Sequence, residues 1–202
     1  GVQTCALPIL ARRVFFRMTT SFRLCLVAAG KAPIMPSRRL FVQCIMTHFS
    51  HILPAENVVL DLECSSKKRA FEQAGLIFEN NCGIARSSVS DNLFARERLG
   101  STGLGHGVAV PHGRIRGLNA PLAAFVRLSE PIPFESPDGE PVKLLIFLLI
   151  PDNVTQQHLE ILSEIAEMFS DRAFRSAMAE DTDATSLHQR LVSWQPPERS
   201  AA

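Results

Sequence analysis

Val142–Ile150, VKLLIFLLI, is the longest strongly apolar run in the chain, and Lys143 is its one charged residue. A continuous apolar run of this length is typical of a strand buried on both faces, because its two alternating sets of side chains each meet an apolar layer. The run is too short to cross a bilayer as a helix. The sequence therefore predicts a central strand of a buried sheet and no insertion into a membrane.

Helical patterns lie on both sides of this strand in the sequence. The pattern that follows it repeats apolar residues from Leu159 to Phe169 at helical spacing, after a capping residue at Thr155. Strands that alternate with helices predict an α/β sandwich, in which helices pack on a mostly buried sheet. The other expected elements, in chain order, are a core-packing segment Ile52–Val59, a helix Lys67–Glu79 capped at Ser65 or Ser66, a helix from Ser87 or Ser88 to Leu99, strands Val108–Val110 and Pro121–Leu128, and helices Arg172–Glu180 and Thr185–Val192.

Acidic residues are distributed unevenly along the 202 residues of the chain. None precedes Glu56; the segment before it carries seven basic residues, and the remainder carries 14 basic and 20 acidic ones. The hydrophobic fraction of 46% is sufficient for a packed core. We expect one domain over residues 46–195 and a short tail over residues 196–202.

Residues 1–45 are expected to be a non-native or disordered extension ahead of a gene product that begins at Met46. Gly1–Ile9, GVQTCALPI, resembles the translation of a sequencing-adapter oligonucleotide, and the change in composition near residue 50 agrees with this start. The acid-free, arginine-rich composition leaves three alternatives open: a transit peptide, a signal-peptide core at Leu24–Gly30, and a basic arm that binds nucleic acid. We favour the first interpretation and expect no nucleic-acid partner.

The five cysteines, at positions 5, 25, 44, 64 and 82, are scattered along the chain and form no CxxC pair. This pattern argues against a disulfide framework and favours a reducing compartment. We therefore expect a cytoplasmic protein.

Six of the eleven glycines lie between Gly100 and Gly117, around Gly100–Arg116, GSTGLGHGVAVPHGRIR. A glycine-rich stretch of this kind raises the question of nucleotide binding. It lacks the Gly-Lys-Ser/Thr of a P-loop, and it precedes a predicted strand, whereas a dinucleotide-binding turn follows one. The sequence therefore argues against a nucleotide, and the glycines indicate tight turns and a close approach to the backbone.

Two further chemistries find little support in the sequence. His106, His112 and His158 match no common zinc spacing, and Cys64 and Cys82 belong to no ligand pair. No G-x-S-x-G elbow marks a serine hydrolase. We predict no metal and no cofactor.

The histidine near the end of the glycine-rich stretch suits nucleophilic chemistry. His112 follows a predicted strand and precedes Gly113 and an arginine. A neutral imidazole attacks phosphorus directly, and backbone N–H groups near Gly113, a second imidazole and an arginine would offset the added charge. His158 suits the second role, because the N-terminus of a helix attracts anions. Spacing alone does not bring the two histidines together, so a structural role for His112 stays open.

Four segments together resemble the mannitol/fructose-type IIA domains of the bacterial sugar phosphotransferase system, and in particular the nitrogen-regulatory branch of that family. They are Ser65–Arg69 (SSKKR), Ala95–Gly103 (ARERLGSTG), Gly107–Arg114 (GVAVPHGR) and Gln157–Leu159 (QHL). The combination of R-E-x-L/M-x-S-T, a glycine-rich step and [I/V]-P-H-G is specific, and the resemblance extends from about Met46 to Trp194. It implies a single α/β domain, a sandwich whose mixed β-sheet is flanked by helices.

The resemblance also implies the roles of individual residues. His112 corresponds to the histidine that accepts a phosphoryl group from an HPr-like phosphocarrier protein. His158 corresponds to the second histidine beside it, and Arg96 corresponds to the arginine that lines the site. The residues expected to bind the phosphoryl substrate are Ser101, Thr102 and Gly113.

The 202 residues contain no sequence that resembles a IIB or a membrane IIC domain. The expected function is therefore that of a phosphocarrier regulator, whose phosphorylated state is recognised by target proteins in nitrogen, potassium or carbon regulation. The alternative is the IIA subunit of a fructose- or mannitol-type sugar transport system, which passes the phosphoryl group to a separate IIB protein.

Overall fold

Strand β6 (Val142–Pro151) lies at the centre of a mixed six-stranded sheet in the computed structural model, which describes residues 48–153 and 156–196. The other strands are β1 (Val58–Leu62), β2 (Gly103–Gly105), β3 (Val108–Ala109), β4 (His112–Ile115) and β5 (Leu122–Ile132). Their order is β1-β5-β6-β3-β2, with β4 also paired to β6. Strands β5 and β6 run antiparallel, as do β2 and β3, whereas β3 and β4 are parallel to β6, and β1 is parallel to β5.

The side chains of β6 alternate between two hydrophobic cores, one on each face of the sheet. Leu144, Ile146 and Leu148 belong to one core. Leu145 and Phe147 belong to the other, and all five side chains are buried. The prediction of a central strand buried on both faces is confirmed, because period-two alternation in an all-apolar strand supplies two cores at once.

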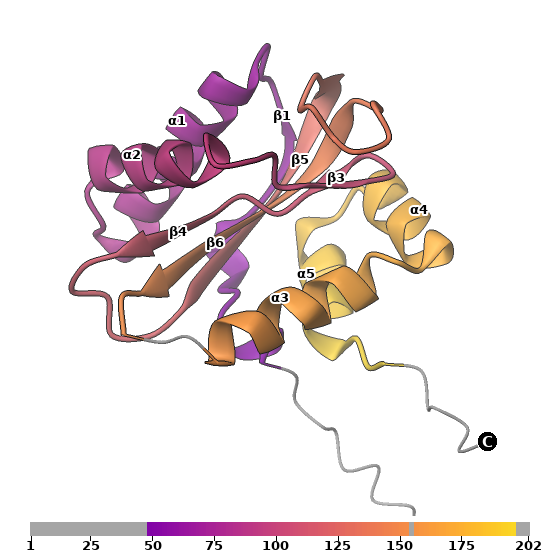
Figure 1. Cartoon of the computed structure of the whole chain (residues 1–202). Helices are drawn as coiled ribbons and strands as arrows, with labels where there is room; N and C mark the ends of the chain where they lie inside the picture. The colour runs from indigo at the N-terminus through magenta and orange to yellow at the C-terminus, as the bar shows by residue number, and fades with distance from the viewer. Residues whose placement is uncertain (1–47, 154–155, 197–202) are drawn as a thin grey trace, which may run out of the picture. The chain divides into compact units, whose positions relative to one another are not determined.

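Helices cover both faces of the sheet (Figure 1). The helices on one face are α1 (Lys67–Cys82) and α2 (Arg86–Glu97), and those on the other face are α3 (Gln156–Met168), α4 (Arg172–Glu180) and α5 (Ala184–Ser193). The predicted α/β sandwich with a mixed sheet is therefore confirmed.

Local sequence signals set the ends of the first two helices. The Ser66 hydroxyl accepts a hydrogen bond from a backbone N–H in the first turn of α1, and Gly83 ends that helix with a left-handed φ of 69°. Helix α2 begins at Arg86, one or two residues before the predicted start at Ser87 or Ser88. It ends at Glu97, two residues before the predicted end at Leu99. The predicted cap at Thr155 lies outside the described residues, as do residues 1–45 and 197–202.

Two segments differ from the sequence-based expectation. Ile52–Val59 contains the 3₁₀ turn Ala55–Asn57 and the start of β1, which continues to Leu62. The glycine-rich stretch itself contains β2, which was not predicted. His112 follows β3, as expected from the predicted strand Val108–Val110, but it is also the first residue of β4, a strand that was not predicted. Pro111, which has no N–H to donate, separates β3 from β4 along the same edge of β6.

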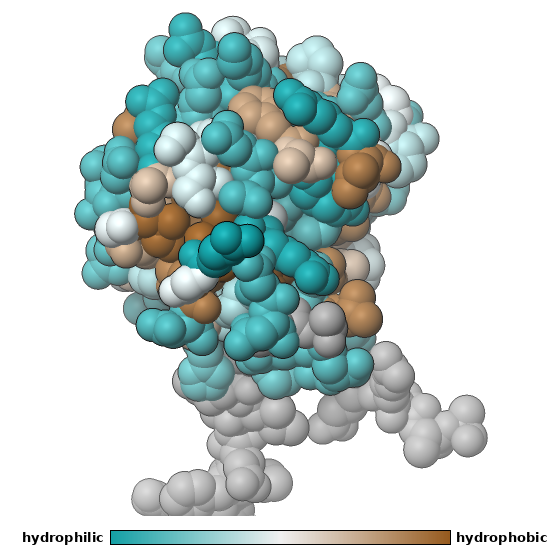
Figure 2. All heavy atoms as spheres, turned by 60° about the vertical axis from the view of Figure 1, so that its left-hand side comes forward, coloured by the Kyte–Doolittle hydropathy of each residue, from teal (hydrophilic) through white to brown (hydrophobic). Residues whose placement is uncertain are grey.

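The surface is largely hydrophilic on the face shown in Figure 2, with a few groups of apolar residues among the polar ones. The large apolar side chains exposed in the described part are Leu99, Leu104 and Leu159. Among the described residues, no helix combines the length and the apolar character needed to cross a membrane.

Candidate functional site

His112 lies at the junction between β3 and β4, where the chain resumes pairing with β6 after Pro111. Its Nδ1 is 3.0 Å from the backbone oxygen of Val110, and its Nε2 is 3.0 Å from Nε of Arg96. A carbonyl oxygen only accepts, so Nδ1 carries the proton in this arrangement, and Nε2 presents a lone pair. The tautomer left by these contacts is the one that a nucleophilic Nε2 requires.

Arg96 is fixed at two points near the end of α2. Its Nε–H donates to Nε2 of His112, and its Nη1 donates to the backbone oxygen of Gly100 at 3.0 Å. Both contacts use the rigid guanidinium plane, so that the position of one end determines the position of the other. The guanidinium is therefore already beside the imidazole in the unphosphorylated protein.

Helix α2 approaches β4 closely because a glycine follows His112. A Cβ added to Gly113 would lie 3.2 Å from atoms of Asn92 and Leu93 on α2, a distance at which α2 or β4 must shift. The absence of a side chain at this position lets the helix pack against the strand. The substrate-binding role assigned to Gly113 from the sequence stays a prediction, and the structure gives Gly113 a packing position beside the site.

His158 is the third residue of α3, as predicted from the sequence, and it comes from the opposite face of the sheet. Its ring centroid lies 5.3 Å from that of His112, at an interplanar angle of 66°. The Nε2 atom of His158 is buried and has no hydrogen-bond partner within residues 48–153 and 156–196. The structure thus brings together the two histidines, whose proximity could not be inferred from spacing, and leaves one nitrogen available to a ligand.

The surroundings favour neutral imidazoles at both positions. Burial lowers the pKa of His112, and the Arg96 guanidinium lowers it further against the opposing hydrogen bond to the Val110 oxygen. Burial also lowers the pKa of His158, with the neighbouring His112 and two arginines, Arg114 and Arg96, acting in the same direction. A neutral His112 is the form that can attack an electrophile.

Two hollows meet at His112. The larger, of about 340 Å³, is lined by Asn92, Ala95, Arg96, Leu99, His112, Gly113, Arg114 and His158. The smaller, of about 210 Å³, is lined by Arg96, Ser101, Thr102, Gly103, Leu104, Val110, His112 and Leu162. All six predicted site residues line one or both hollows. Leu99, which is 84% exposed, lines the larger hollow, so apolar surface adjoins the imidazole.

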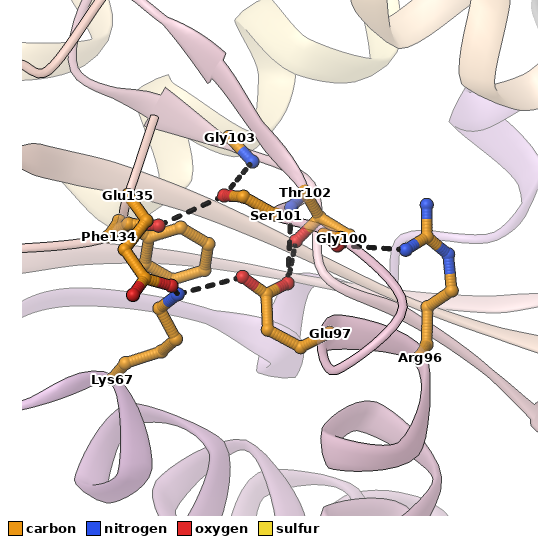
Figure 3. A network of polar contacts seen from close by, with 9 residues as sticks. All are labelled: Lys67, Arg96, Glu97, Gly100, Ser101, Thr102, Gly103, Phe134 and Glu135. Atoms are coloured by element: carbon orange, nitrogen blue, oxygen red, sulfur yellow. Dashed lines mark hydrogen bonds and ion pairs between the residues drawn. The ribbon is translucent and has the colours of Figure 1, made fainter. Parts of the chain in front are cut away.

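Two of the three predicted substrate-binding residues carry hydroxyl groups, and both hydroxyls donate hydrogen bonds within the protein (Figure 3). Ser101 Oγ donates to the backbone oxygen of Phe134 at 3.0 Å and accepts from the N–H of Gly103. Thr102 Oγ1 donates to Glu97 at 2.6 Å. Their substrate-binding role stays a prediction, and these contacts give both residues a part in holding the loop beside the site.

His106, the third histidine weighed as a metal ligand, lines neither of these hollows. It lies with Asp138 and Glu140 in an exposed group whose ligand atoms are within 4.8 Å of one another. One oxygen of Asp138 already accepts from the backbone N–H of His106, and the other accepts from that of Glu140. The structure therefore separates His106 from the His112–His158 pair.

Sequence reasoning missed Glu97 and Lys67 as part of the site. Glu97 follows Arg96 directly in the R-E pair, and its side chain binds Lys67 and Thr102 rather than projecting into solvent. Both residues lie in segments that carry the family resemblance, Lys67 in Ser65–Arg69 and Glu97 in Ala95–Gly103. That signal gave them no role, because a glutamate near the end of a helix is ordinarily a solvated residue. The partners lie 30 and five residues away in the chain, so a local pattern does not reveal them.

The protein is thus a mixed α/β sandwich in which Arg96 and His158 lie beside His112, the first residue of β4. The chain belongs to the family described as "Phosphoenolpyruvate-dependent sugar phosphotransferase system, EIIA 2", which matches residues 51–193. The predicted family is confirmed by this match.

Individual relatives agree with the family. The chain is 37% identical to a nitrogen regulatory protein of Pseudomonas aeruginosa over 148 residues, which are 73% of this chain and 96% of that protein. It is 31% identical to a fructose-specific EIIA component of Haloferax volcanii, over 67% of this chain and 88% of that protein. The crystal structure of nitrogen regulatory protein IIA-Ntr from Neisseria meningitidis superposes with a TM-score of 0.67 and 46% identity, over 70% of this chain and 97% of that one. The similarity to the nitrogen-regulatory branch that was inferred from the sequence is therefore confirmed.

Proposed function

We propose that the protein is a phosphocarrier regulator that accepts a phosphoryl group on Nε2 of His112 from the phosphohistidine of an HPr-like carrier. The observation that carries this proposal is the pair of contacts of the His112 ring, 3.0 Å from Nδ1 to the Val110 oxygen and 3.0 Å from Nε2 to Nε of Arg96, from which the tautomer with the proton on Nδ1 follows. Its lowered pKa keeps the ring neutral at cytoplasmic pH. Similarity to nitrogen regulatory proteins supports the regulatory part of the proposal.

The transfer needs no further reactant. The lone pair of His112 Nε2 forms the new N–P bond while the N–P bond of the carrier breaks, and the carrier ring departs as a neutral imidazole that retains its remaining N–H. The His112 Nδ1–H stays on the Val110 oxygen, where the positive charge of the phosphorylated ring strengthens that hydrogen bond. Atoms, electrons and protons therefore balance between two imidazoles, without a nucleotide or a metal.

Charge that develops on the phosphoryl oxygens meets Arg96 from one side and His158 from the other. As the N–P bond forms, the Nε–H of Arg96 turns from His112 Nε2 to a phosphoryl oxygen, because Nε2 no longer has a lone pair. Strand β4 pairs with one strand only in the described sheet, so alternate N–H groups around Gly113 face away from β6 and add to these donors. The substrate-binding roles of Ser101, Thr102 and Gly113 belong to the same proposal.

Phosphorylation supplies a signal because it adds negative charge beside exposed apolar surface at Leu99. A target protein that packs on this surface is repelled or attracted according to the phosphorylation state. The partners are therefore the HPr-like carrier and target proteins in nitrogen, potassium or carbon regulation. The alternative, transfer to a separate IIB protein of a sugar system, is favoured by the similarity to a fructose-specific EIIA component.

The proposal is tested by incubating the protein with phosphoenolpyruvate, an enzyme I-type kinase and an HPr-type carrier. We expect an acid-labile mass gain of one phosphoryl group, absent in His112→Ala. His106→Ala is the matched control, because it removes an exposed imidazole outside the site and is expected to leave the gain intact. A gain that persists in His112→Ala overturns the assignment, and rapid onward transfer to a fructose-type IIB protein favours the transport alternative.

A further inference from the structure

Glu97 is a charged residue with little access to water at the end of α2. Its side chain is only 8% exposed, and it directly follows Arg96. A carboxylate at such a position is costly unless its oxygens are paired and hydrogen-bonded. The contacts of Glu97 therefore indicate what its charge holds in place.

Both carboxylate oxygens of Glu97 are engaged (Figure 3). Oε1 accepts from Nζ of Lys67, the first residue of α1, at 2.9 Å. Oε2 accepts from both the backbone N–H and the hydroxyl of Thr102, at 3.1 and 2.6 Å. Glu97 thus joins α1, α2 and the loop that follows α2, with a charge-assisted contact at each end.

The loop held by Glu97 carries the backbone oxygen that anchors Arg96. Gly100 accepts from Nη1 of Arg96, and its φ of 149° lies in a region that favours glycine. Thr102, two residues later, is fixed by Glu97, and its backbone oxygen accepts from the N–H of Val110, two residues before His112. Hydrogen bonds thus link Lys67 to Glu97 and Glu97 to Thr102, and the backbone from Thr102 back to Gly100 connects them to the Arg96 guanidinium.

Lys67 balances the charge of Glu97. Burial lowers the pKa of Lys67, but its hydrogen bonds to Glu97 and Glu135 outweigh this effect and raise the pKa above its ordinary value. Lys67 Nζ also lies 4.4 Å from the centroid of the Phe134 ring. An unbalanced carboxylate one residue from Arg96 would oppose the negative charge that a phosphoryl group brings.

We propose that Glu97 is a positioning residue for phosphoryl transfer, which holds the Gly100–Thr102 loop so that Arg96 stays against His112, with Lys67 as its counterion. The inference rests on the proposed function of His112 and adds residues that sequence reasoning left outside the site. Glu97 acts through Arg96 and does not contact the reacting atoms. The effect of its removal therefore depends on the presence of Arg96.

A double-mutant cycle tests this dependence by measuring the single-turnover rate of transfer from a phosphorylated HPr-type carrier. Glu97→Gln keeps the size of the side chain and is expected to slow transfer about tenfold in the presence of Arg96. In an Arg96→Ala background the same substitution is expected to slow transfer less than about twofold. An equal slowing in both backgrounds overturns the inference, since it would mean that Glu97 acts through general stability.

Glu135→Gln is the matched control, because it also removes a carboxylate that lies 3.0 Å from Lys67. The Glu135 side chain is 85% exposed and, among the described residues, makes no hydrogen bond to the Gly100–Thr102 loop. We expect its rate to match that of the unsubstituted protein, and a slowing equal to that of Glu97→Gln overturns the inference. If Glu97→Gln does not fold, Thr102→Val removes one of the two loop contacts at nearly constant volume, and the same cycle applies to it.

A readout without any carrier separates this inference from the proposed function. The ¹⁵N–¹H signal of Arg96 Nε reports its hydrogen bond to His112 in the unphosphorylated protein. We expect Glu97→Gln to shift this signal and to speed its exchange with water, whereas Glu135→Gln leaves it unchanged. A signal that is unchanged in Glu97→Gln overturns the positioning role, whereas a protein that takes up no phosphoryl group but shows the shift overturns only the proposed function.

Discussion

The two helices that supply side chains to His112 do so in opposite ways. Helix α2 brings Arg96 from one face of the sheet, with its guanidinium held by His112 and Gly100 before any phosphoryl group arrives. Helix α3 brings His158 from the other face, with its buried Nε2 unpartnered within residues 48–153 and 156–196. Arg96 is therefore held in place before phosphorylation, whereas Nε2 of His158 has no hydrogen-bond partner among the described residues.

The packing behind the two supports explains this difference. Helix α2 lies against β4 at Gly113, where an added Cβ would be 3.2 Å from atoms of the helix, and the Glu97 contacts tie the end of α2 to the following loop. Helix α3 is hydrogen-bonded to another segment away from the site, where Glu164 accepts from the backbone N–H groups of His48 and Phe49. A preorganised donor stabilises a transition state without rearrangement, so we expect the α2 side to dominate the rate.

Among the substitutions that test the contrast between the α2 and α3 sides, replacing Arg96 is expected to lower the transfer rate most. Arg96→Ala removes a positive charge and the contact to His112 Nε2, and we expect the transfer rate to fall by about 10²-fold or more. Arg96→Lys should recover part of the rate, because an ammonium retains the charge but cannot hold the imidazole and the Gly100 oxygen with one rigid plane. Rapid-quench measurement of transfer from the phosphorylated carrier checks both, and an effect under threefold for Arg96→Ala would contradict a dominant α2 side.

Replacing His158 gives a smaller effect, because its Nε2 makes no bond in the unphosphorylated protein that fixes another group. We expect His158→Ala to slow transfer about tenfold and His158→Gln to slow it less, since the amide N–H can donate to a phosphoryl oxygen. Circular dichroism should show an unchanged fold for both. Transfer at the original rate in His158→Ala would remove His158 from the mechanism, and a loss equal to that of Arg96→Ala would erase the contrast between the two sides.

Gly113→Ala probes the close packing of α2 on β4. The added Cβ meets Asn92 and Leu93 at 3.2 Å, so we expect a loss in the free energy of unfolding of about 1–3 kcal/mol from overpacking. A displacement of α2 also moves Arg96, and we expect transfer to slow by about threefold through this misplacement. Denaturant unfolding and transfer kinetics on the same sample check the two effects. A stable variant with full activity would show that the close approach does not position Arg96.

The smallest expected effect is that of mild acid on transfer. His112 has a pKa below its ordinary value of 6.5, so at pH 6.5 more than half of the rings stay neutral and the rate should fall by less than about twofold. The unfolded chain takes up a proton at this histidine near pH 6.5 and the folded protein does not, so this group makes unfolding easier as the pH falls below that value. An NMR titration of the His112 ring checks the pKa, which Arg96→Ala should raise. A pKa above 6.5 in the unsubstituted protein would contradict the burial and Arg96 contributions.

Much of the fold follows from local sequence patterns. The apolar run from Val142 fixed a central buried strand, and the helix spacing with a serine cap placed α1 nearly to its observed bounds. The strand β1 was missed because Pro54 and Asn57 interrupt the apolar segment Ile52–Val59, in which a 3₁₀ turn immediately precedes the strand. Predictions succeeded where a pattern repeats over several residues and failed where a short element depends on its neighbours in the sheet.

The candidate site was also predicted only in part from the sequence. Motif resemblance identified His112, His158 and Arg96, and the structure brings the three together. It did not reveal which nitrogen of His112 is free, because the carbonyl of Val110 decides that point. Nor did it reveal that Glu97 is shielded from water by partners that are distant in sequence.

The sequence by itself determined the class of fold, the residues that form the helices and central strands, and the histidine at which chemistry was to be expected. These depend on periodicity, caps and motif residues that act within a few positions of the chain. Only the tertiary structure decided that the Arg96 guanidinium is held by both His112 and the Gly100 oxygen, whereas Nε2 of His158 has no hydrogen-bond partner among the described residues. Hydrogen bonds between segments depend on how helices from opposite faces pack on the sheet, and that packing is a property of the whole core.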